Sequence, residues 1–305
     1  MKKDRLKIFV ILCLLSFGSF AQKQKTEIIK VFYLGGQSNM DGYGFNTDLP
    51  KSLKKPIKDV WIFHGNPSPD EQKNGGLGIW EMLKPGHGKG FSSDGKKNNL
   101  SNRFGIELSF AQKLKALYPN EKIAIIKYSR GGTSIDSLAA AHFGSWEPDF
   151  NGKTGINQYD HFLATVRNAM AIKDIDGNGK KDILVPSGIL WMQGESDATV
   201  DEALANRYYA NLKRLMDLIR ATFRTDDLPV VIGKISDSWN NDKGKVWTYG
   251  ELVQYAQEKY VKTDNNAAII KSTRYYKYSD PYHYDSKGYI DFGEKFAEAV
   301  FKLNQ

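Results

Sequence analysis

Short apolar runs and longer amphipathic patterns alternate along most of this chain, and this alternation limits the folds that it can adopt. The runs are rich in β-branched residues and predict strands at 28–34, 123–128, 183–192, 229–233 and 267–270. Helical periodicity predicts helices at 104–118, 159–172, 201–223, 246–260 and 288–303. Strands that alternate with helices form βαβ units. We therefore expect a three-layer α/β/α fold with a mainly parallel, five-stranded sheet.

The first predicted strand leads into Gly35–Asn39, a turn in which Ser38 follows two glycines and a glutamine. Glycine permits the sharp change of direction, and open parallel sheets bind ligands at the carboxyl ends of their strands. A serine at such a place is usually the N-cap of a helix and less often a nucleophile. The rest of the chain must therefore show whether Ser38 has chemical partners.

Three other segments carry polar residues where they can meet Ser38. Arg130–Thr133 and Gln193–Asp197 follow the second and third predicted strands, and Asp280–His283 precedes the last helix. Because the carboxyl ends of parallel strands lie at one edge of a sheet, we expect the first two segments beside Ser38. The last one supplies an acid and a base to the same place.

Serine chemistry explains why these residue types occur together. A hydroxyl becomes a nucleophile when a base takes its proton, and the pKa of histidine suits this task. A carboxylate then holds the histidine ring, and N–H donors stabilise the oxyanion of the intermediate. We predict Ser38 as nucleophile and His283 as base, with either Asp280 or Glu195 behind the histidine. The predicted oxyanion-hole donors are the backbone N–H groups of Ser38 and Gly132 and the side chain of Gln193.

Each segment also has an ordinary structural explanation. Asp280 can form a turn with His283 on the surface, and Glu195 can favour the start of the helix near residue 201. Arg103 and Glu107 can form an i,i+4 ion pair on a helix. The joint occurrence of all these segments favours a serine hydrolase over the separate explanations.

Four motifs, taken in order, resemble those of the SGNH-hydrolase superfamily. They are Gly36–Asn39, Arg103–Glu107, Gln193–Asp197 and Asp280–His283, and the similarity covers about the whole chain after residue 21. The most similar branch contains sialate O-acetylesterase-like proteins and the acetylxylan esterases of carbohydrate esterase family six. The resemblance implies a flavodoxin-like α/β/α fold and the metal-independent deacetylation of sugars through an acyl-serine.

The resemblance also implies roles for individual residues. Ser38 matches the nucleophile and His283 the base. Asp280 matches the Asp-x-x-His pair of the superfamily, whereas Glu195 matches the glutamate that takes this role in the family-six branch. Gln193 and the turn Gly131–Gly132 match the oxyanion region.

The expected activity is that of a carbohydrate O-acetylesterase of the xylan or sialate type, acting on an acetylated oligo- or polysaccharide. The chain departs from the branch at Ile106, where proline is frequent, and at Met192, where xylan esterases tend to have histidine. The second departure weakens the xylan assignment. The alternatives are an esterase for another acyl group and a carbohydrate-binding protein that has lost turnover. Candidate sugar-facing residues are Trp80, Trp146 and Trp239.

The first 21 residues predict export. A basic start precedes the apolar segment Ile8–Phe20, and small residues favour cleavage after Ala21. The apolar segment is short for a bilayer, and Cys13 lacks the neighbours of a lipid-anchoring site. We expect a secreted or periplasmic protein with a signal peptide at 1–21 and no stable membrane anchor. Since Cys13 is the only cysteine, the mature chain has no thiol chemistry.

Residues 22–305 contain no linker, repeat or low-complexity tract and predict a single esterase domain. The net charge is +8, of which +3 belongs to the first 21 residues, and the remaining lysines are mixed with acids. Such a distribution does not favour nucleic acid as a partner. The histidines lack the spacing of zinc ligands, so the sequence does not support a zinc site. The resemblance implies that catalysis requires no cofactor.

A possible cation site lies between the second predicted helix and the third predicted strand. Asp174, Asp176 and Asn178 alternate as the first ligands of a calcium loop do, and Asp182 can be a further ligand. Val185 stands where an EF-hand has its glutamate. The alternative is a polar turn without an ion. We predict that any calcium here is structural and not catalytic.

Overall fold

The computed structural model describes residues 26–68, 72–153, 155–242 and 244–305. The predicted signal peptide, residues 1–21, lies outside these ranges. Among the helices that they contain, none combines the length and the hydropathy that a bilayer crossing requires.

A seven-stranded sheet forms the middle layer of the molecule, with the strand order β11-β10-β9-β1-β8-β3-β4. Its strands are β1 (Glu27–Gly36), β3 (Val60–His64), β4 (Trp80–Met82), β8 (Lys122–Ser129), β9 (Asp182–Met192), β10 (Val230–Gly233) and β11 (Ala267–Ile270). All neighbours pair in parallel except β4, which runs antiparallel to β3 at the edge. The predicted fold class and mainly parallel sheet are confirmed.

The sheet has two strands more than the five predicted, β3 and β4. Val60–His64 is fully buried but short, and no helix separates it from the next strand, so the βαβ pattern does not reveal it. β4 is an edge strand whose side chains are partly exposed, so it lacks a continuous apolar run.

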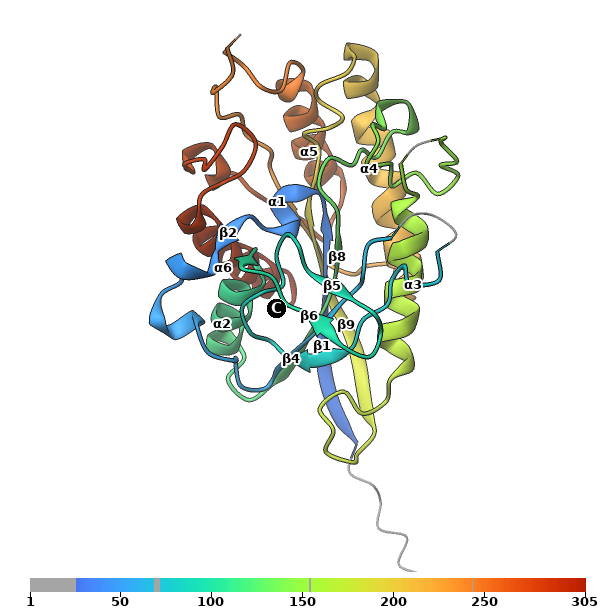
Figure 1. Ribbon diagram of the computed structural model, residues 1–305. Coiled ribbons are helices and arrows are strands. Elements are labelled where there is room, and N and C mark those ends of the chain that lie inside the picture. Colours follow the sequence, from blue (N-terminus) through green and yellow to red (C-terminus); the bar gives the residue numbers. More distant parts are fainter. Residues whose placement is uncertain (1–25, 69–71, 154, 243) are drawn as a thin grey trace, which may run out of the picture.

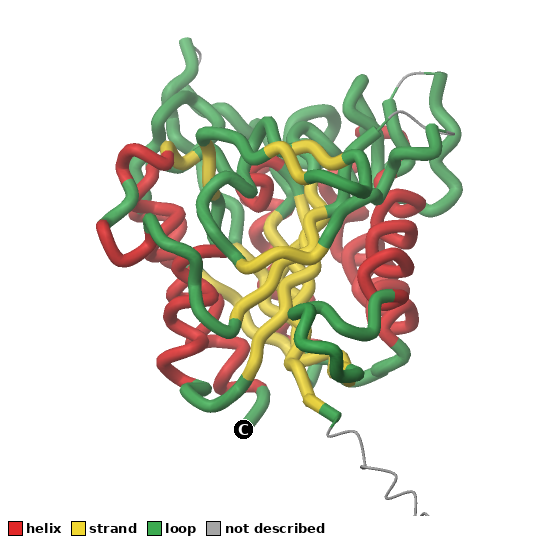
Figure 2. Tube along the Cα trace, turned by 60° about the horizontal axis from the view of Figure 1, so that its bottom comes forward, coloured by secondary structure: helices red, strands yellow, loops and turns green. Residues whose placement is uncertain are grey.

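Helices cover both faces of the sheet, which gives the three layers visible in Figures 1 and 2. On one face α2 (Glu107–Leu117) packs against α6 (Ser286–Leu303). On the other face lie α3 (Gln158–Ala171), α4 (Glu202–Phe223) and α5 (Gly250–Thr263). The five predicted helices are confirmed, with ends that differ by a few residues. Side chains of Asn157, Asp201 and Asp285 cap the starts of α3, α4 and α6.

Short elements surround this framework. They are α1 (Ser38–Asp41), the antiparallel pair β2 (Gly44–Phe45) and β7 (Arg103–Phe104), the antiparallel pair β5 (Ser92–Ser93) and β6 (Asn98–Asn99), and 3₁₀ turns at Asn46–Asp48, Lys51–Leu53, Ser137–Ala139 and Ser272–Tyr275. The β2–β7 pair joins the chain that follows Ser38 to the chain that enters α2.

A buried ion pair supports the segment that follows β1. Lys127 of β8 and Glu107 of α2 have fully buried side chains, and 2.9 Å separates Lys127 Nζ from Glu107 Oε2. Lys127 Nζ also donates to the carbonyls of Asp41, at 2.9 Å, and His87, at 2.8 Å. The i,i+4 pair of Arg103 with Glu107 is therefore not formed, and Arg103 Nη1 donates instead to the carbonyl of Tyr43.

The register of the central strands places the polar loops at one level. Gly36, at the end of β1, is paired with Ser129 of β8 on one side and with Met192 of β9 on the other. The loops that begin at Ser38, Arg130 and Gln193 therefore leave the same edge of the sheet side by side.

Candidate active site

The turn that carries Ser38 requires glycine at position 36. Gly36 has a φ of 141°, and a Cβ atom on it would lie only 2.0 Å from the carbonyl oxygen of Met192. The backbone N–H of Gln37 donates to that same oxygen at 2.8 Å. Ser38 is then the first residue of α1, and the N-cap is Gln37. The helix-cap explanation for Ser38 is therefore not realised.

Side chains on either side of Ser38 tie its turn to the neighbouring loops. Gln37 Oε1 accepts from the backbone N–H of Gly194, at 3.2 Å, and so holds the loop after β9. Asn39 Nδ2 donates to Glu195 Oε1 at 2.9 Å and to the carbonyl of Tyr282 at 3.1 Å. Ser38 thus stands between two residues that fix its position relative to the other predicted site segments.

Asn39 also holds the segment that carries His283. Its Oδ1 atom accepts from the hydroxyl of Tyr289 at 2.8 Å and from the backbone N–H of Tyr284 at 3.3 Å. Together with the bond to Tyr282, these contacts bind one buried amide to the chain on both sides of His283. The turn with Ser38 and the loop with His283 are consequently positioned by one side chain.

His283 and Asp280 form the acid–base pair that the sequence predicts. His283 Nδ1 lies 2.7 Å from Asp280 Oδ2 and 2.9 Å from Oδ1. The carboxylate is itself held by the backbone N–H groups of Tyr282 and His283, which donate to Oδ1 at 2.8 and 2.9 Å. Because the Asp280 carboxylate only accepts, His283 Nδ1 must carry the hydrogen in this contact. The lone pair of neutral His283 is then on Nε2.

Tyr43 fixes the plane of the histidine ring. Its ring stacks on that of His283 with a centroid distance of 3.5 Å and an interplanar angle of 5°. Sequence reasoning missed this residue, because no spacing pattern relates Tyr43 to a histidine so far along the chain. The one available signal was proximity: Tyr43 is an aromatic residue that follows the candidate nucleophile Ser38 closely in the sequence.

Burial and nearby cations keep His283 neutral. Burial lowers the pKa of His283 below its ordinary value of 6.5. The Asp280 carboxylate opposes this shift, whereas the positive charges of Lys89 and Arg103 add to it. For Asp280, burial raises the pKa, but hydrogen bonds from His283 and from two backbone N–H groups hold it below 3.8. The pair therefore consists of a carboxylate and a neutral imidazole near neutral pH.

Glu195, the other candidate acid, is placed differently. Its side chain is 1% exposed and its Oε1 atom accepts from Asn39. Burial raises the pKa of Glu195 to about 7. Within the described part of the chain, the carboxylate on His283 Nδ1 is that of Asp280, and Glu195 reaches the site through Asn39.

The glycine turn after β8 lies against Ser38. A Cβ atom on Gly131 would lie 3.2 Å from the Cβ of Ser38, and Gly132 has a φ of 75°. The ring of Phe143 covers Gly132, since an added Cβ there would lie 2.2 Å from Phe143 Cδ2. Side chains are thus excluded from this turn, which leaves its backbone close to the serine, as an oxyanion site requires.

Gln193 does not fill the oxyanion role predicted for it. Its side chain is fully buried, and protein acceptors surround Nε2: Asp197 Oδ2 at 2.7 Å, the carbonyl of Thr133 at 3.0 Å and Gln37 Oε1 at 3.3 Å. An amide has no third hydrogen for a substrate. Gln193 therefore joins the loop after β9 to the loop after β8. Asp197 likewise holds the latter loop by accepting from the N–H groups of Ile135 and Asp136.

Ser38 and His283 line one cavity of about 310 Å³. The turn Gly131–Gly132 forms part of its wall, and further lining residues are Tyr43, Lys89, Phe143, Ser196, Trp247 and Tyr282. The serine is 6% exposed, so the cavity gives limited access to its hydroxyl. The predicted nucleophile, base and glycine turn are therefore brought together, and Asp280 stands behind the base.

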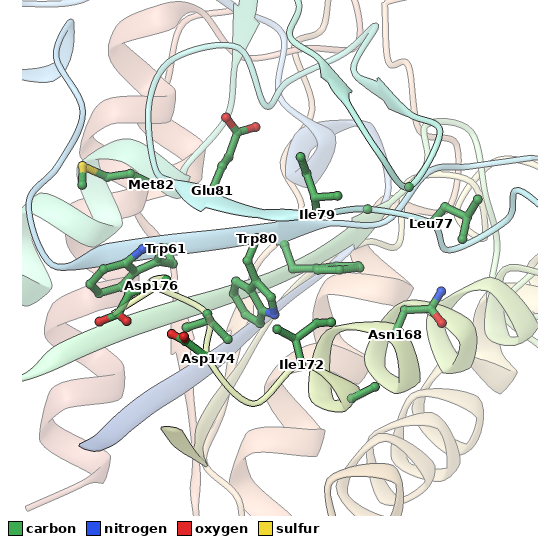
Figure 3. Close-up of a pocket in the computed structure, with 16 residues that line it drawn as sticks. Trp61, Leu77, Ile79, Trp80, Glu81, Met82, Asn168, Ile172, Asp174 and Asp176 are labelled. Carbon is green, nitrogen blue, oxygen red and sulfur yellow. The ribbon is translucent and has the colours of Figure 1, made fainter. Parts of the chain in front are cut away.

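The tryptophans predicted to face a sugar lie elsewhere. Trp146 is fully buried, and its Nε1 donates to Thr133 Oγ1 at 3.0 Å. Trp80 lines a separate cavity of about 810 Å³, next to the loop with Asp174 (Figure 3). Trp239 is 63% exposed and is not among the residues that line the Ser38 cavity.

Trp247 and Tyr282 are two further aromatic residues at this cavity that the sequence reasoning did not select as sugar-facing. Their ring centroids are 5.7 Å apart. Trp247 lies on the loop after β10, the same loop from which Trp239 was selected. The periodicity predicts Trp247 inside the helix at 246–260, whereas α5 begins at Gly250 and leaves Trp247 on the preceding loop, where its ring reaches the cavity.

Comparison with known proteins agrees with this geometry. Residues 28–302 match the family model described as "Carbohydrate esterase, sialic acid-specific acetylesterase". None of the curated protein sequences matches the chain. The match to the family model covers almost all of the described residues, and it confirms the resemblance to the sialate O-acetylesterase branch.

Solved structures with the same fold include a protein from Arabidopsis thaliana, with a TM-score of 0.62 and 19% identity over 90% of this chain and 99% of that one. A carbohydrate acetylesterase from Xanthomonas citri has a TM-score of 0.59 and 18% identity over 90% of this chain and 56% of its own. NanS has a TM-score of 0.56 and 16% identity over 91% of this chain and 97% of its own. With the fold, the site geometry and the family model in agreement, the chain belongs to the family of sialic acid-specific acetylesterases among the carbohydrate esterases.

Proposed function

We propose that this protein is an exported carbohydrate O-acetylesterase that uses Ser38 as its nucleophile. The observation that carries the proposal is the cavity in which Ser38 and the Asp280-paired His283 both lie. Family membership supports ester hydrolysis on sugars. The predicted signal peptide supports action outside the cytoplasm, where the substrate is an acetylated oligo- or polysaccharide.

The proposed reaction has two halves. Ser38 Oγ attacks the acetyl carbonyl carbon while His283 Nε2 takes the hydroxyl proton, and Asp280 stabilises the imidazolium. The backbone N–H groups of Ser38 and Gly132 donate to the oxyanion. His283 then gives its proton to the departing sugar oxygen, which leaves acetyl-Ser38. In the second half, His283 activates a water that attacks the acetyl group, and its proton returns to Ser38 as acetate leaves.

The cavity wall supports a sugar as the leaving group. Trp247 and Tyr282 present aromatic rings beside the serine, and such rings stack on the apolar faces of sugars. Lys89 adds a positive charge at the same wall. Both sialate and xylan esters remain within the proposal, and no catalytic metal or cofactor is part of it.

Acetate release from a panel of substrates tests the proposed function. Purified protein is incubated with O-acetylated sialosides and with acetylated xylan, mannan and pectin, and acetate is measured by an enzyme-coupled assay. We expect release from at least one of them, with the preferred sugar identified by its kcat/KM. Binding of a glycan without acetate release would support the non-catalytic alternative and contradict the proposal.

Asp280→Asn and Glu195→Gln distinguish the two candidate acids. We expect Asp280→Asn to lower kcat by about 10⁴-fold, the effect known for the equivalent aspartate of a serine protease, because it disturbs both tautomer and charge. Glu195→Gln removes no group from His283 and is expected to have a much smaller effect on kcat. Initial rates with p-nitrophenyl acetate measure both. A larger loss in Glu195→Gln would assign the acid role to Glu195.

The pH profile of kcat/KM should report the lowered pKa of His283. Since the base must be neutral, and burial lowers the pKa of this histidine, the acid limb is expected at a midpoint below 6.5. Lys89→Gln removes a positive charge that lowers the pKa of His283, so the acid limb of this variant should move to higher pH. Lys96→Gln, on an exposed lysine outside the cavity, is the control. A limb that does not move in Lys89→Gln would contradict the prediction.

A further inference from the structure

Three carboxylates converge at the edge of the sheet opposite to Ser38. Glu27 begins β1 and Asp182 begins β9, and the two are register partners. Asp176 belongs to the loop that leads into β9. One carboxylate oxygen of each residue lies within 4.8 Å of the other two. The amino ends of two central strands and one loop therefore present oxygen atoms to a common point.

Asp182 has a carboxylate oxygen that no group in the described part of the chain satisfies. The residue is 3% exposed, and its Oδ2 atom accepts from the backbone N–H of Ile175 at 2.7 Å. Its Oδ1 atom is buried and has no hydrogen-bond partner among the described residues. A buried carboxylate oxygen without a donor is costly, and such an atom indicates a bound cation or another ligand.

The neighbouring loop has the shape of an ion-binding loop. Asp174 accepts from the backbone N–H groups of Asn178, at 3.1 Å, and Gly179, at 2.8 Å, which folds the loop on itself. Gly177 and Gly179 have φ values of 71° and 78°. Figure 3 shows Asp174 and Asp176 on this loop, close to each other at the wall of the larger cavity.

Two lysines compensate part of this charge. Lys122 Nζ lies 2.6 Å from Asp176 Oδ2 and also contacts Glu27, while Lys180 Nζ lies 3.0 Å from Glu27 Oε1. Within the described part of the chain, neither ammonium forms an ion pair with Asp182 or Asp174. The two ammonium groups thus pair with Glu27 and Asp176, and Asp182, which is 3% exposed, is left without an ion pair among the described residues.

We propose that a calcium ion binds among Glu27, Asp176 and Asp182 and displaces the ammonium of Lys122. The donors are carboxylate oxygens without histidine or cysteine, which suits calcium and not zinc. The sequence analysis predicted Asp174 and Asn178 as ligands, but in this proposal they only shape the loop. Glu27, on β1, is a ligand instead. Lys122 Nζ lies 5.6 Å from the centroid of the Trp61 ring in the structure, and we expect the displaced ammonium to stay beside this ring.

The ion would join the start of β1 to the start of β9 and to the loop that precedes β9. Because the site is at the edge away from His283, it is structural, and its test does not depend on esterase activity. The full chain is treated with EGTA and dialysed, and CaCl₂ is then titrated by calorimetry, with MgCl₂ in a parallel titration. Thermal unfolding is followed at increasing calcium concentration. We expect one calcium bound per chain and a midpoint that rises with calcium and then levels off.

Two ligand variants and one control sharpen the test. Asp182→Asn and Asp176→Asn should weaken calcium binding at least tenfold, while Asp226→Asn, at an exposed carboxylate outside the cluster, should leave it unchanged. Lys122→Met removes the competing ammonium and should tighten calcium binding. Absence of both heat and a thermal shift in the wild-type chain at 10 mM calcium, a concentration well above the affinity range of extracellular sites, would overturn the proposal. So would calcium binding that Asp182→Asn leaves intact.

Discussion

Replacing Ser38 by alanine is expected to lower kcat for p-nitrophenyl acetate by about 10⁴-fold to 10⁶-fold, the range found when the nucleophile of a serine hydrolase is removed. The substitution deletes one oxygen from a cavity whose other walls are unchanged. Substrate binding should therefore persist while turnover is lost. Initial rates measured beside the wild type give the effect, and the melting temperature shows that Ser38→Ala is folded.

Ser196→Ala provides a comparison within the same cavity. Ser196 lines that cavity on the loop after β9, and the Asp280-paired histidine belongs to another segment. We expect its loss of kcat to be far smaller than that of Ser38→Ala. A phosphonate ester that reacts with activated serines should label Ser38, as peptide mass analysis would show. Equal rates for Ser38→Ala and the wild type, or labelling of Ser196 instead, would remove Ser38 from the mechanism.

The second large effect concerns stability and the pair formed by Lys127 and Glu107. Glu107→Gln keeps the shape of the side chain but leaves the ammonium of Lys127 buried without its carboxylate. Both side chains are completely buried, so we expect the free energy of unfolding to fall by about 3–5 kcal/mol. Urea denaturation followed by circular dichroism measures this change. The double variant Lys127→Met/Glu107→Met should recover part of the loss, since no charge then remains in the core.

An exposed pair in the same protein is the matched control. Lys213 and Asp217 lie one turn apart on α4, with side chains 56% and 51% exposed. Asp217→Asn is expected to cost less than about 1 kcal/mol, because water and salt screen such a pair. If Glu107→Gln costs no more than Asp217→Asn, the core pair contributes little. A further expectation is that Glu107→Gln loses esterase activity at lower urea, since Lys127 also holds the carbonyl of Asp41, in the helix that Ser38 begins.

The sequence sufficed for those parts of the structure that depend on local patterns. Parallel strands, their helices and the polar residues at strand ends follow from periodicity and from residue type, so Ser38, Asp280 and His283 could be selected in advance. Their meeting at one cavity follows from the topology of a parallel sheet.

What could not be predicted depends on contacts between distant segments. The choice of Asp280 over Glu195 rests on a loop geometry that places only one of them on His283 Nδ1. The stacking of Tyr43 and the place of Glu27 in the acidic cluster join residues that no pattern connects. Gln193 was expected to donate to the oxyanion. Its amide donates instead to Asp197, on the same loop, and to the carbonyl of Thr133, on the loop after β8.

The contacts of Asn39 have a consequence for when the protein becomes active during its maturation. This side chain bonds to residues 243, 245 and 250 positions later in the chain. Contacts between such distant positions form late, because a long stretch of chain must be ordered first. The turn with Ser38 is synthesised early but its contacts are completed by residues 282–289, so a chain that has not reached them carries Ser38 without His283 beside it. Recovery of esterase activity during refolding should therefore coincide with the slowest folding phase and not with the formation of helices.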